Sequence, residues 1–144
     1  MALRTLIFII LSNLFISADQ PPKGDAIIGK WISDKGNLQL QVYKKENQYR
    51  AKVIFHSGKT EGEVWRDEKN PDPALRSRTL LGKDLLTQMR YDPDNNDWED
   101  GIIYDPSSGK SFEAIVKLVN PNTLKIKGYW LIKTFSKTKI FKRM

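Results

Sequence analysis

Two arginines two residues apart, Arg76 and Arg78, are the side chains whose type and spacing most clearly indicate chemistry. A guanidinium group presents several N–H donors in one plane and pairs readily with carboxylates and phosphates. Two interpretations are open. The arginines either pair with nearby acids such as Asp72 or Asp105 and fasten their own loop to the fold, or one of them binds the anionic head group of a ligand.

The segment that precedes the arginines predicts a structured loop. Asn70 and Asp72 alternate with two prolines, which marks a chain reversal because proline fixes φ and lacks an N–H group. Residues 74–76 are expected to close a single helical turn, with Asp72 as its cap and Pro73 at its first position. It is the one helical turn that we expect in the fold.

Catalytic chemistry has little support in the sequence. The single histidine, His56, lies on the polar side of its predicted strand with no partner pattern around it, which favours a surface histidine. The chain has no cysteine and no Gly-x-Ser-x-Gly motif, so disulfides, a thiol nucleophile and a serine elbow are excluded. We expect no catalytic residues, no cofactor and no enzymatic activity.

An acidic run over residues 92–100 places oxygen-bearing side chains at alternate positions, as a calcium-binding loop does. The run lacks the central glycine of such a loop and has Ile103 where the bidentate glutamate should lie. A solvated hairpin turn is therefore the favoured interpretation, and no metal site is predicted.

Apolar and polar residues alternate through most of the chain after residue 27. Such a period of two, rich in β-branched and aromatic residues, is typical of half-buried strands. In the third strand Phe55 is expected on the apolar side and His56 on the polar side, with the alternation broken only at Ile54. The predicted strands lie near residues 29–33, 38–42, 49–56, 85–91, 98–104, 111–118, 124–130 and 137–143.

Turn-forming residues separate these strands. The clearest turn begins at Asp105, and Gly109 is expected to end it with a positive φ. Short connections imply antiparallel neighbours in chain order, and a sheet with one apolar side buries that side by closing on itself. The predicted fold is all-β: a single antiparallel up-and-down β-barrel of about eight strands.

The first and last strands of such a barrel are neighbours. The Gly-x-Trp pattern ending at Trp31, together with the late basic residue Arg143, resembles the pattern with which lipocalins close one end of the barrel. We expect Arg143 to approach the ring of Trp31 within cation–π reach, roughly 6 Å.

The N-terminal segment predicts export. One positive residue, Arg4, precedes an apolar run that ends in Ser17 and Ala18, a pattern typical of a secretory signal and short for a membrane span. Residues 1–18 are interpreted as a signal peptide, residues 19–26 as a linker and residues 27–144 as the barrel domain; an uncleaved anchor is the alternative. We expect the protein in the periplasm or outside the cell, with no stable membrane span after cleavage.

The formal net charge of +7 does not by itself indicate a nucleic-acid partner. The lysines are spread along the chain and many alternate with apolar residues, which is typical of solvated strand faces. We expect no nucleic-acid binding, and a monomer.

Segments spread over nearly the whole barrel domain carry a family resemblance. The chain resembles the exported bacterial proteins grouped as domain of unknown function 2147, and this resemblance implies a lipocalin-like barrel in the periplasm or outside the cell without implying an activity. The matching segments are residues 28–31, 42–45, 69–82, 98–106, 108–112, 123–129 and 135–143.

Function depends on the interior of the predicted barrel. Eight strands enclose enough space for one small molecule, and a small hydrophobic or amphiphilic ligand would then have Trp98, Tyr104 and Trp130 near the wall and Arg76 or Arg78 near the mouth. The alternative is a ligand-free structural or interaction protein of the cell envelope, with aromatic side chains filling the interior; an enzyme ranks third. The interior volume distinguishes the first two.

Overall fold

A computed structural model describes residues 20–58, 62–130 and 132–144, without the side chains of residues 130 and 132–135. The predicted signal segment, residues 1–18, lies outside the described residues. In this part of the chain no helix is long and apolar enough to cross a membrane.

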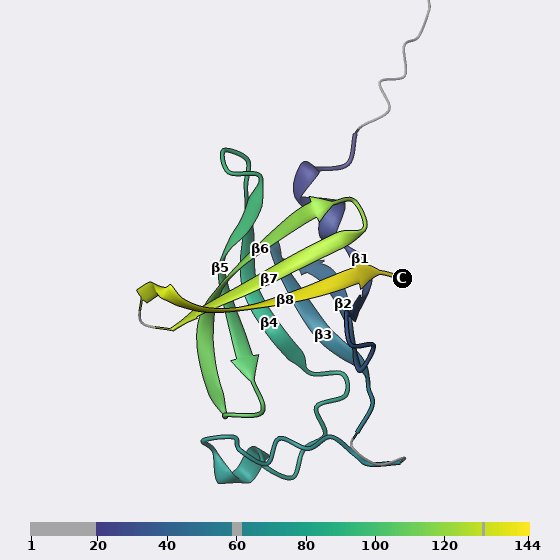
Figure 1. The fold of residues 1–144 in the computed structure, drawn as a ribbon, viewed down its shortest axis with the longest axis vertical. Helices are drawn as coiled ribbons and strands as arrows, with labels where there is room; N and C mark the ends of the chain where they lie inside the picture. The colour runs from purple at the N-terminus through teal and green to yellow at the C-terminus, as the bar shows by residue number, and fades with distance from the viewer. Residues whose placement is uncertain (1–19, 59–61, 131) are drawn as a thin grey trace, which may run out of the picture.

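Eight strands form a closed barrel (Figure 1). Each strand pairs antiparallel with the next, and the last pairs with the first, so the predicted up-and-down β-barrel is confirmed. Closure gives the two terminal strands each other as hydrogen-bonding partners. The strands are β1 Gly29–Ser33, β2 Leu38–Lys45, β3 Gln48–His56, β4 Asp84–Asp92, β5 Asp97–Asp105, β6 Lys110–Asn120, β7 Thr123–Trp130 and β8 Ile132–Arg143.

Two short 3-10 helices accompany the barrel in the described residues. The expected helical turn is η2, Pro73–Leu75, in the connection between β3 and β4, and the Asp72 carboxylate accepts a hydrogen bond from the Ala74 N–H at 3.0 Å. The second, η1 at Lys23–Ile27, was not predicted and falls largely in the expected linker. It lies against one end of the barrel (Figure 1).

Trp31 and Arg143 close this end of the barrel. The two residues are cross-strand partners between β1 and β8, and the Arg143 guanidinium lies 4.2 Å from the centroid of the Trp31 ring, as expected. Two guanidinium nitrogens also donate to the carbonyls of Ala26 and Ile28, at 2.7 and 3.1 Å. Arg143 thereby ties η1 and the first strand to the last.

The helix η1 completes the closure. Ile27 is fully buried, and its carbonyl accepts a hydrogen bond from the Trp31 indole at 2.9 Å. The carbonyl of Gly24 accepts one from the Trp98 indole at 3.0 Å. Buried tryptophan N–H groups need such partners, so the two indoles anchor η1 over the end of the core.

A β-bulge between β2 and β3 changes which side chains of β3 enter the barrel. Gln39 pairs with Phe55, whereas Leu40 pairs with Val53, so Ile54 is an extra residue in β3. An extra residue reverses the alternation beyond it. Phe55 is consequently 43% exposed, and His56 turns toward the interior, so the expected orientations of both were wrong.

Candidate functional site

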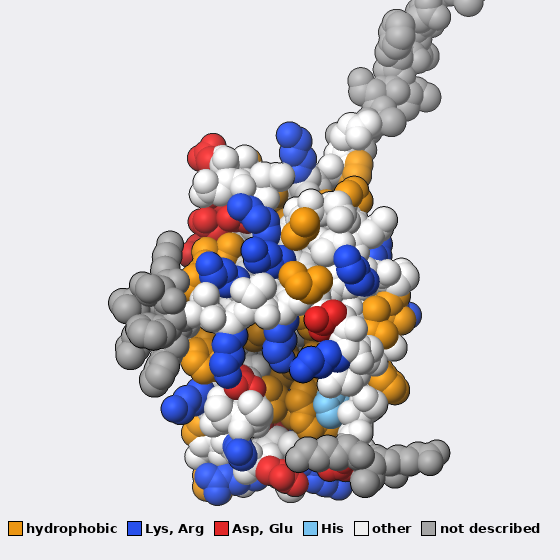
Figure 2. Space-filling view, in the orientation of Figure 1, with side chains coloured by type: hydrophobic (Ala, Val, Ile, Leu, Met, Phe, Trp, Pro, Cys, Tyr) orange, Lys and Arg blue, Asp and Glu red, His pale blue; other side chains and the backbone are white. Residues whose placement is uncertain are grey.

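A cavity of about 1020 Å³ opens at the end of the barrel opposite η1. Its walls are formed by apolar side chains from several strands, and Figure 2 shows hydrophobic side chains at the bottom of a hollow, beside the single histidine. The apolar lining comprises Leu38, Leu40, Trp65, Leu85, Leu86, Ile103, Phe112, Ile126 and Phe141. A barrel interior of this kind suits one small apolar molecule.

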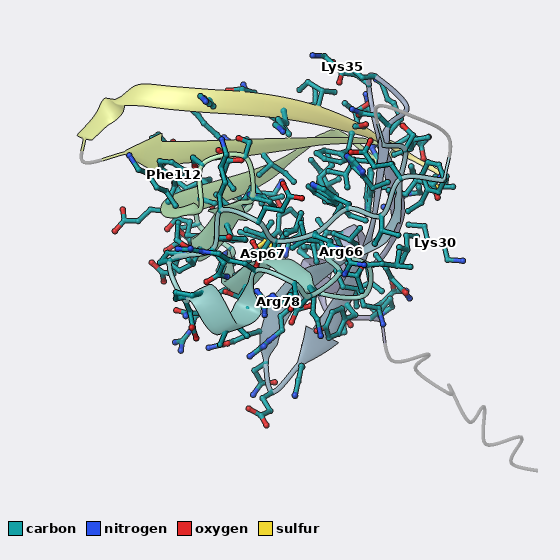
Figure 3. All side chains as sticks on the ribbon, turned by 90° about the horizontal axis from the view of Figure 1, so that it is seen from below. Lys30, Lys35, Arg66, Asp67, Arg78 and Phe112 are labelled. Carbon is teal, nitrogen blue, oxygen red and sulfur yellow. The ribbon has the colours of Figure 1, made fainter. Side chains whose placement is uncertain are left out.

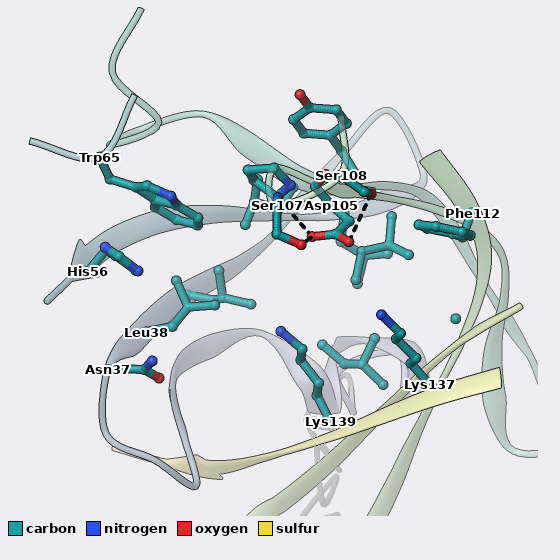
Figure 4. Close-up of a pocket in the computed structure, with 18 of the residues that line it drawn as sticks. Asn37, Leu38, His56, Trp65, Asp105, Ser107, Ser108, Phe112, Lys137 and Lys139 are labelled. Carbon is teal, nitrogen blue, oxygen red and sulfur yellow. Dashed lines mark hydrogen bonds between the residues drawn. The ribbon is translucent and has the colours of Figure 1, made fainter. Parts of the chain in front are cut away.

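Two lysines of β8 bring positive charge into this cavity. Lys137 and Lys139 lie at alternate positions of the strand, on the same side as Phe141, and their amino ends are directed into the pocket (Figure 4). Like charges held side by side in a partly apolar space favour an anion between them. The cavity therefore combines an apolar wall with a cationic mouth.

Asp105 faces the lysines from the other side of the pocket (Figure 4). Its carboxylate accepts hydrogen bonds from the hydroxyls of Ser107 and Ser108 at 2.7 and 2.9 Å. Burial alone would raise the pKa of Asp105, but these hydrogen bonds and the charge of Lys137 lower it below its usual value. The carboxylate is thus ionised at neutral pH and partly balances the lysines.

His56 lines the cavity beside Trp65 (Figure 4). The imidazole stacks on the indole with ring centroids 3.9 Å apart, and its Nδ1 atom is buried without a hydrogen-bond partner. Burial lowers the pKa of His56, although the charge of Glu63 opposes this. The imidazole is therefore neutral at pH 7, with a polar atom free to meet a ligand.

The connection between β3 and β4 contains a buried carboxylate that fixes this end of the molecule. Asp67 is fully buried and accepts hydrogen bonds from the hydroxyl of Tyr104, the amide of Asn70 at 2.7 Å and Nε of Arg78 at 2.9 Å. Figure 3 shows Asp67 and Arg78 together in this connection, seen from the open end. Burial would raise the pKa of Asp67, but the three hydrogen bonds lower it.

The two arginines of the loop have structural partners. Arg78 forms an ion pair with Asp67 at 2.9 Å, and Nε of Arg76 donates to the carbonyl of Asn70 at 2.8 Å. Arg78 thus pairs with an acid, as the first interpretation expects, but the acid is Asp67 and not Asp72 or Asp105. Arg76 donates to a backbone carbonyl. Neither arginine lines the cavity.

The predicted wall residues have different positions. Tyr104 lines the cavity. Trp98 does not, because it packs at the closed end, where its ring lies 5.2 Å from that of Tyr91. Trp130 ends β7, and its side chain lies outside the described part of the structure, so its expected role stays a prediction.

Gly109 confirms the expected turn and adds a close contact. It has a φ of +69°, and a Cβ atom there would lie 1.8 Å from the carbonyl oxygen of Lys69. The turn between β5 and β6 therefore packs directly on the connection that holds Asn70, and only glycine fits the contact.

Sequence reasoning missed the polar residues at the mouth, namely His56, Lys137 and Lys139, and also Trp65. A signal existed for the lysines, since a period of two places Lys137 and Lys139 on the side of Phe141. Trp65 lies outside the regular strands, where alternation gives no information.

Comparisons with known proteins agree with this architecture. The structure of protein HP1028 from the human pathogen Helicobacter pylori, which belongs to the lipocalin family, superimposes with a TM-score of 0.69 over 81% of this chain and 82% of that chain, at 19% sequence identity. This likeness concerns the fold. No curated protein matches the sequence. The family model described as "Uncharacterized protein conserved in bacteria (DUF2147)" matches residues 29–143, and the chain belongs to this family.

Proposed function

We propose that the protein binds a small amphiphilic molecule, with its apolar part inside the barrel and an anionic head group between Lys137 and Lys139. The observation that carries this proposal is the cavity of about 1020 Å³, which combines apolar walls with two inward lysines. Ligand pockets in proteins commonly enclose about 300–1,000 Å³ and contain a few polar groups that orient the ligand.

The arrangement of charge supports an anionic head group over a neutral one. Three lysines, Lys110, Lys137 and Lys139, line the cavity against two carboxylates, those of Glu63 and Asp105, which leaves one formal positive charge. Lys137 and Lys139 face Asp105 across the pocket (Figure 4). A carboxylate or phosphate head would supply the further negative charge and accept hydrogen bonds from both lysines. The Nδ1 atom of His56 offers an additional polar contact at the rim.

The open interior disfavours the ligand-free alternative. A purely structural barrel would be expected to fill its interior with side chains, because packed cores contain few voids larger than a water molecule. Two large aromatic residues, Trp31 and Trp98, are fully buried at the closed end and leave the other end hollow. We further propose that the protein is exported, in keeping with its N-terminal segment, and that it acts as a monomer.

Titration with a long-chain fatty acid tests this proposal, with the alcohol of the same chain length as the neutral comparison. We expect saturable binding by calorimetry and a preference of about tenfold for the acid, the size of effect that a charge-assisted hydrogen bond gives. The variant K137Q/K139Q should lose this preference and retain binding of the alcohol, because the apolar wall is unchanged.

The matched control is K117Q/K125Q, which removes the same charge from a cross-strand pair of exposed lysines on β6 and β7. It should bind the acid as the natural protein does. If neither amphiphile binds saturably, or if the control loses affinity as much as K137Q/K139Q, the proposed site is wrong.

A further inference from the structure

Three carboxylates converge at the closed end of the barrel, far from the cavity in the fold. Asp92 and Asp97 are cross-strand partners at the hairpin between β4 and β5, and Glu99 follows two residues later. One oxygen atom from each of the three lies within 4.8 Å of the others. Partial desolvation and the charges of Asp97 and Asp92 raise the pKa of Glu99, as expected for acids crowded together.

Asp97 supplies the observation that points to a ligand. The residue is only 6% exposed, and its Oδ1 atom is buried without a hydrogen-bond partner. An unpaired carboxylate oxygen in such a position is costly, and a bound ion is one of the recognised reasons for it. The carboxylates of Asp92 and Glu99 lie beside the carboxylate of Asp97.

We propose that Asp92, Asp97 and Glu99 bind a divalent cation with a preference for oxygen ligands, and that this cation is Ca²⁺. All three ligands are hard carboxylate oxygens, and no described nitrogen or sulfur ligand belongs to the group. Ca²⁺ accepts six to eight oxygens in flexible geometry, whereas Mg²⁺ requires a nearly ideal octahedron. A hairpin that brings three acids together below an exposed turn fits the first requirement better.

Asn95 offers a fourth ligand in the same turn. Its amide nitrogen donates to Asp92 at 2.8 Å and to Glu99 at 3.3 Å, so the carboxamide already lies between two of the proposed ligands. A half-turn of this amide would exchange its NH₂ group for its oxygen and present that oxygen to the cation. Water would complete the coordination on the exposed side.

The sequence did not reveal this group because the acidic run was compared with a calcium-binding loop, in which all ligands come from one continuous segment. In that comparison the last ligand should fall at Ile103. Here the ligands come from both strands of a hairpin, and pairing of Asp92 with Asp97 places them together. The spacing along the chain is therefore a poor guide to the spacing of the oxygens.

Calorimetric titration of the chelator-treated protein with CaCl₂ tests the proposal. We expect one saturable site with a dissociation constant on the order of 10⁻⁴–10⁻³ M, the range of exposed extracellular calcium modules. Mg²⁺ should bind about tenfold more weakly or worse, for the geometric reason above. The thermal unfolding midpoint should rise with CaCl₂ and not with NaCl of the same ionic strength.

Three variants make the assignment specific. D97N and E99Q should each weaken Ca²⁺ binding by about tenfold or more, since each removes a charged ligand. The control D94N removes the same charge from an exposed residue of the same turn and should change the affinity by less than about twofold. Circular dichroism identifies any variant that fails to fold, and E99Q is the second test should D97N do so.

The proposal would be overturned if Ca²⁺ showed no saturable binding up to about 10 mM, which is above the range of such sites. It would also be overturned if D97N and E99Q both kept the natural affinity for Ca²⁺, or if D94N lost as much affinity as they do. A rise in the unfolding midpoint with NaCl equal to that with CaCl₂ would be the fourth contrary result. The first result, no saturable Ca²⁺ binding, is the one expected if a buried water and not a cation occupies the position beside Asp97. The lysine variant K137Q/K139Q should bind Ca²⁺ normally, so this test is independent of the amphiphile site.

Discussion

The imidazole of His56 stacks on the indole of Trp65 at the mouth of the barrel, with an angle of 17° between the ring planes. The contact joins the last residue of β3 to the connection that follows it, and both residues line the cavity. It places a tryptophan, the strongest fluorophore among the side chains, where a ligand would enter.

Replacing Trp65 by phenylalanine should separate the fluorescence signal from binding. In the natural protein we expect an amphiphile to change the tryptophan emission, because Trp65 lines the cavity whereas Trp31 and Trp98 are buried at the closed end. In a W130F background, which removes the signal of the predicted wall residue Trp130, W65F should lose most of this change. It should still bind in a calorimetric titration, with affinity reduced by about tenfold at most because the ring is smaller. An undiminished emission change in W65F would place the ligand elsewhere.

His56 should make the stability of the protein depend on pH. Its pKa in the folded state lies below the ordinary value of 6.5, chiefly through burial. The unfolded chain therefore binds the proton more tightly, so the stability is complete above pH 6.5 and falls as the pH drops toward the folded pKa. Urea unfolding at a series of pH values should show this decrease, and H56Q should lack that part of it. Identical pH profiles for H56Q and the natural protein would contradict the prediction.

The strands were predictable because alternation is a local property. A period of two in residues such as Leu124 and Ile126 identifies a strand and its buried side without knowledge of the partner strand. The orientation of His56 was not predictable in this way, because the bulge at Ile54 is defined by the pairing of β3 with β2. The break in alternation at Ile54 was visible, but its consequence required the register.

The partner of Arg78 shows the same limit in a loop. Acids close to the arginine in the chain, such as Asp72, were the expected partners. In the structure the connection doubles back, with Arg66 bridged to Thr79, and the N–H of Asp67 donates to the Arg78 carbonyl at 3.1 Å. Backbone pairing brings Asp67 to Arg78, and nothing in the local residue pattern encodes that pairing.

The hydrogen bond from Tyr104 to Asp67 should be measurable through the free energy of unfolding. At pH 7 we expect Y104F to lose about 1–3 kcal/mol, because the variant removes a donor from a buried carboxylate. Chemical denaturation provides the measurement. In the double-mutant cycle with D67N, the effect of Y104F should shrink, and additive effects would argue against the interaction.

The same tyrosine should contribute an alkaline limit to stability. Burial and the hydrogen bond to Asp67 raise the pKa of Tyr104 from 10.0 to about 12. The unfolded chain loses this proton first, so the contribution is present below pH 10 and is lost as the pH rises toward about 12. Over this range the stability of Y104F should fall less steeply than that of the natural protein. Equal slopes would contradict the assignment.

Replacing Gly109 by alanine should test the contact between the β5–β6 turn and the β3–β4 connection, with Gly36 as the matched control position. Their φ angles are +69° and +71°, so replacement by alanine imposes similar backbone strain, about 1–2 kcal/mol at either position. A Cβ atom at Gly109 would lie 1.8 Å from the Lys69 carbonyl oxygen, whereas one at Gly36 meets nothing within 4 Å. G109A should therefore lower the free energy of unfolding by about 1–3 kcal/mol more than G36A does, the usual cost of overpacking.

Because Ser107 and Ser108 of this turn hold Asp105 at the mouth, G109A should also weaken amphiphile binding while G36A leaves it unchanged. Equal destabilisation of the two variants in urea would mean that the connection moves away freely from the turn.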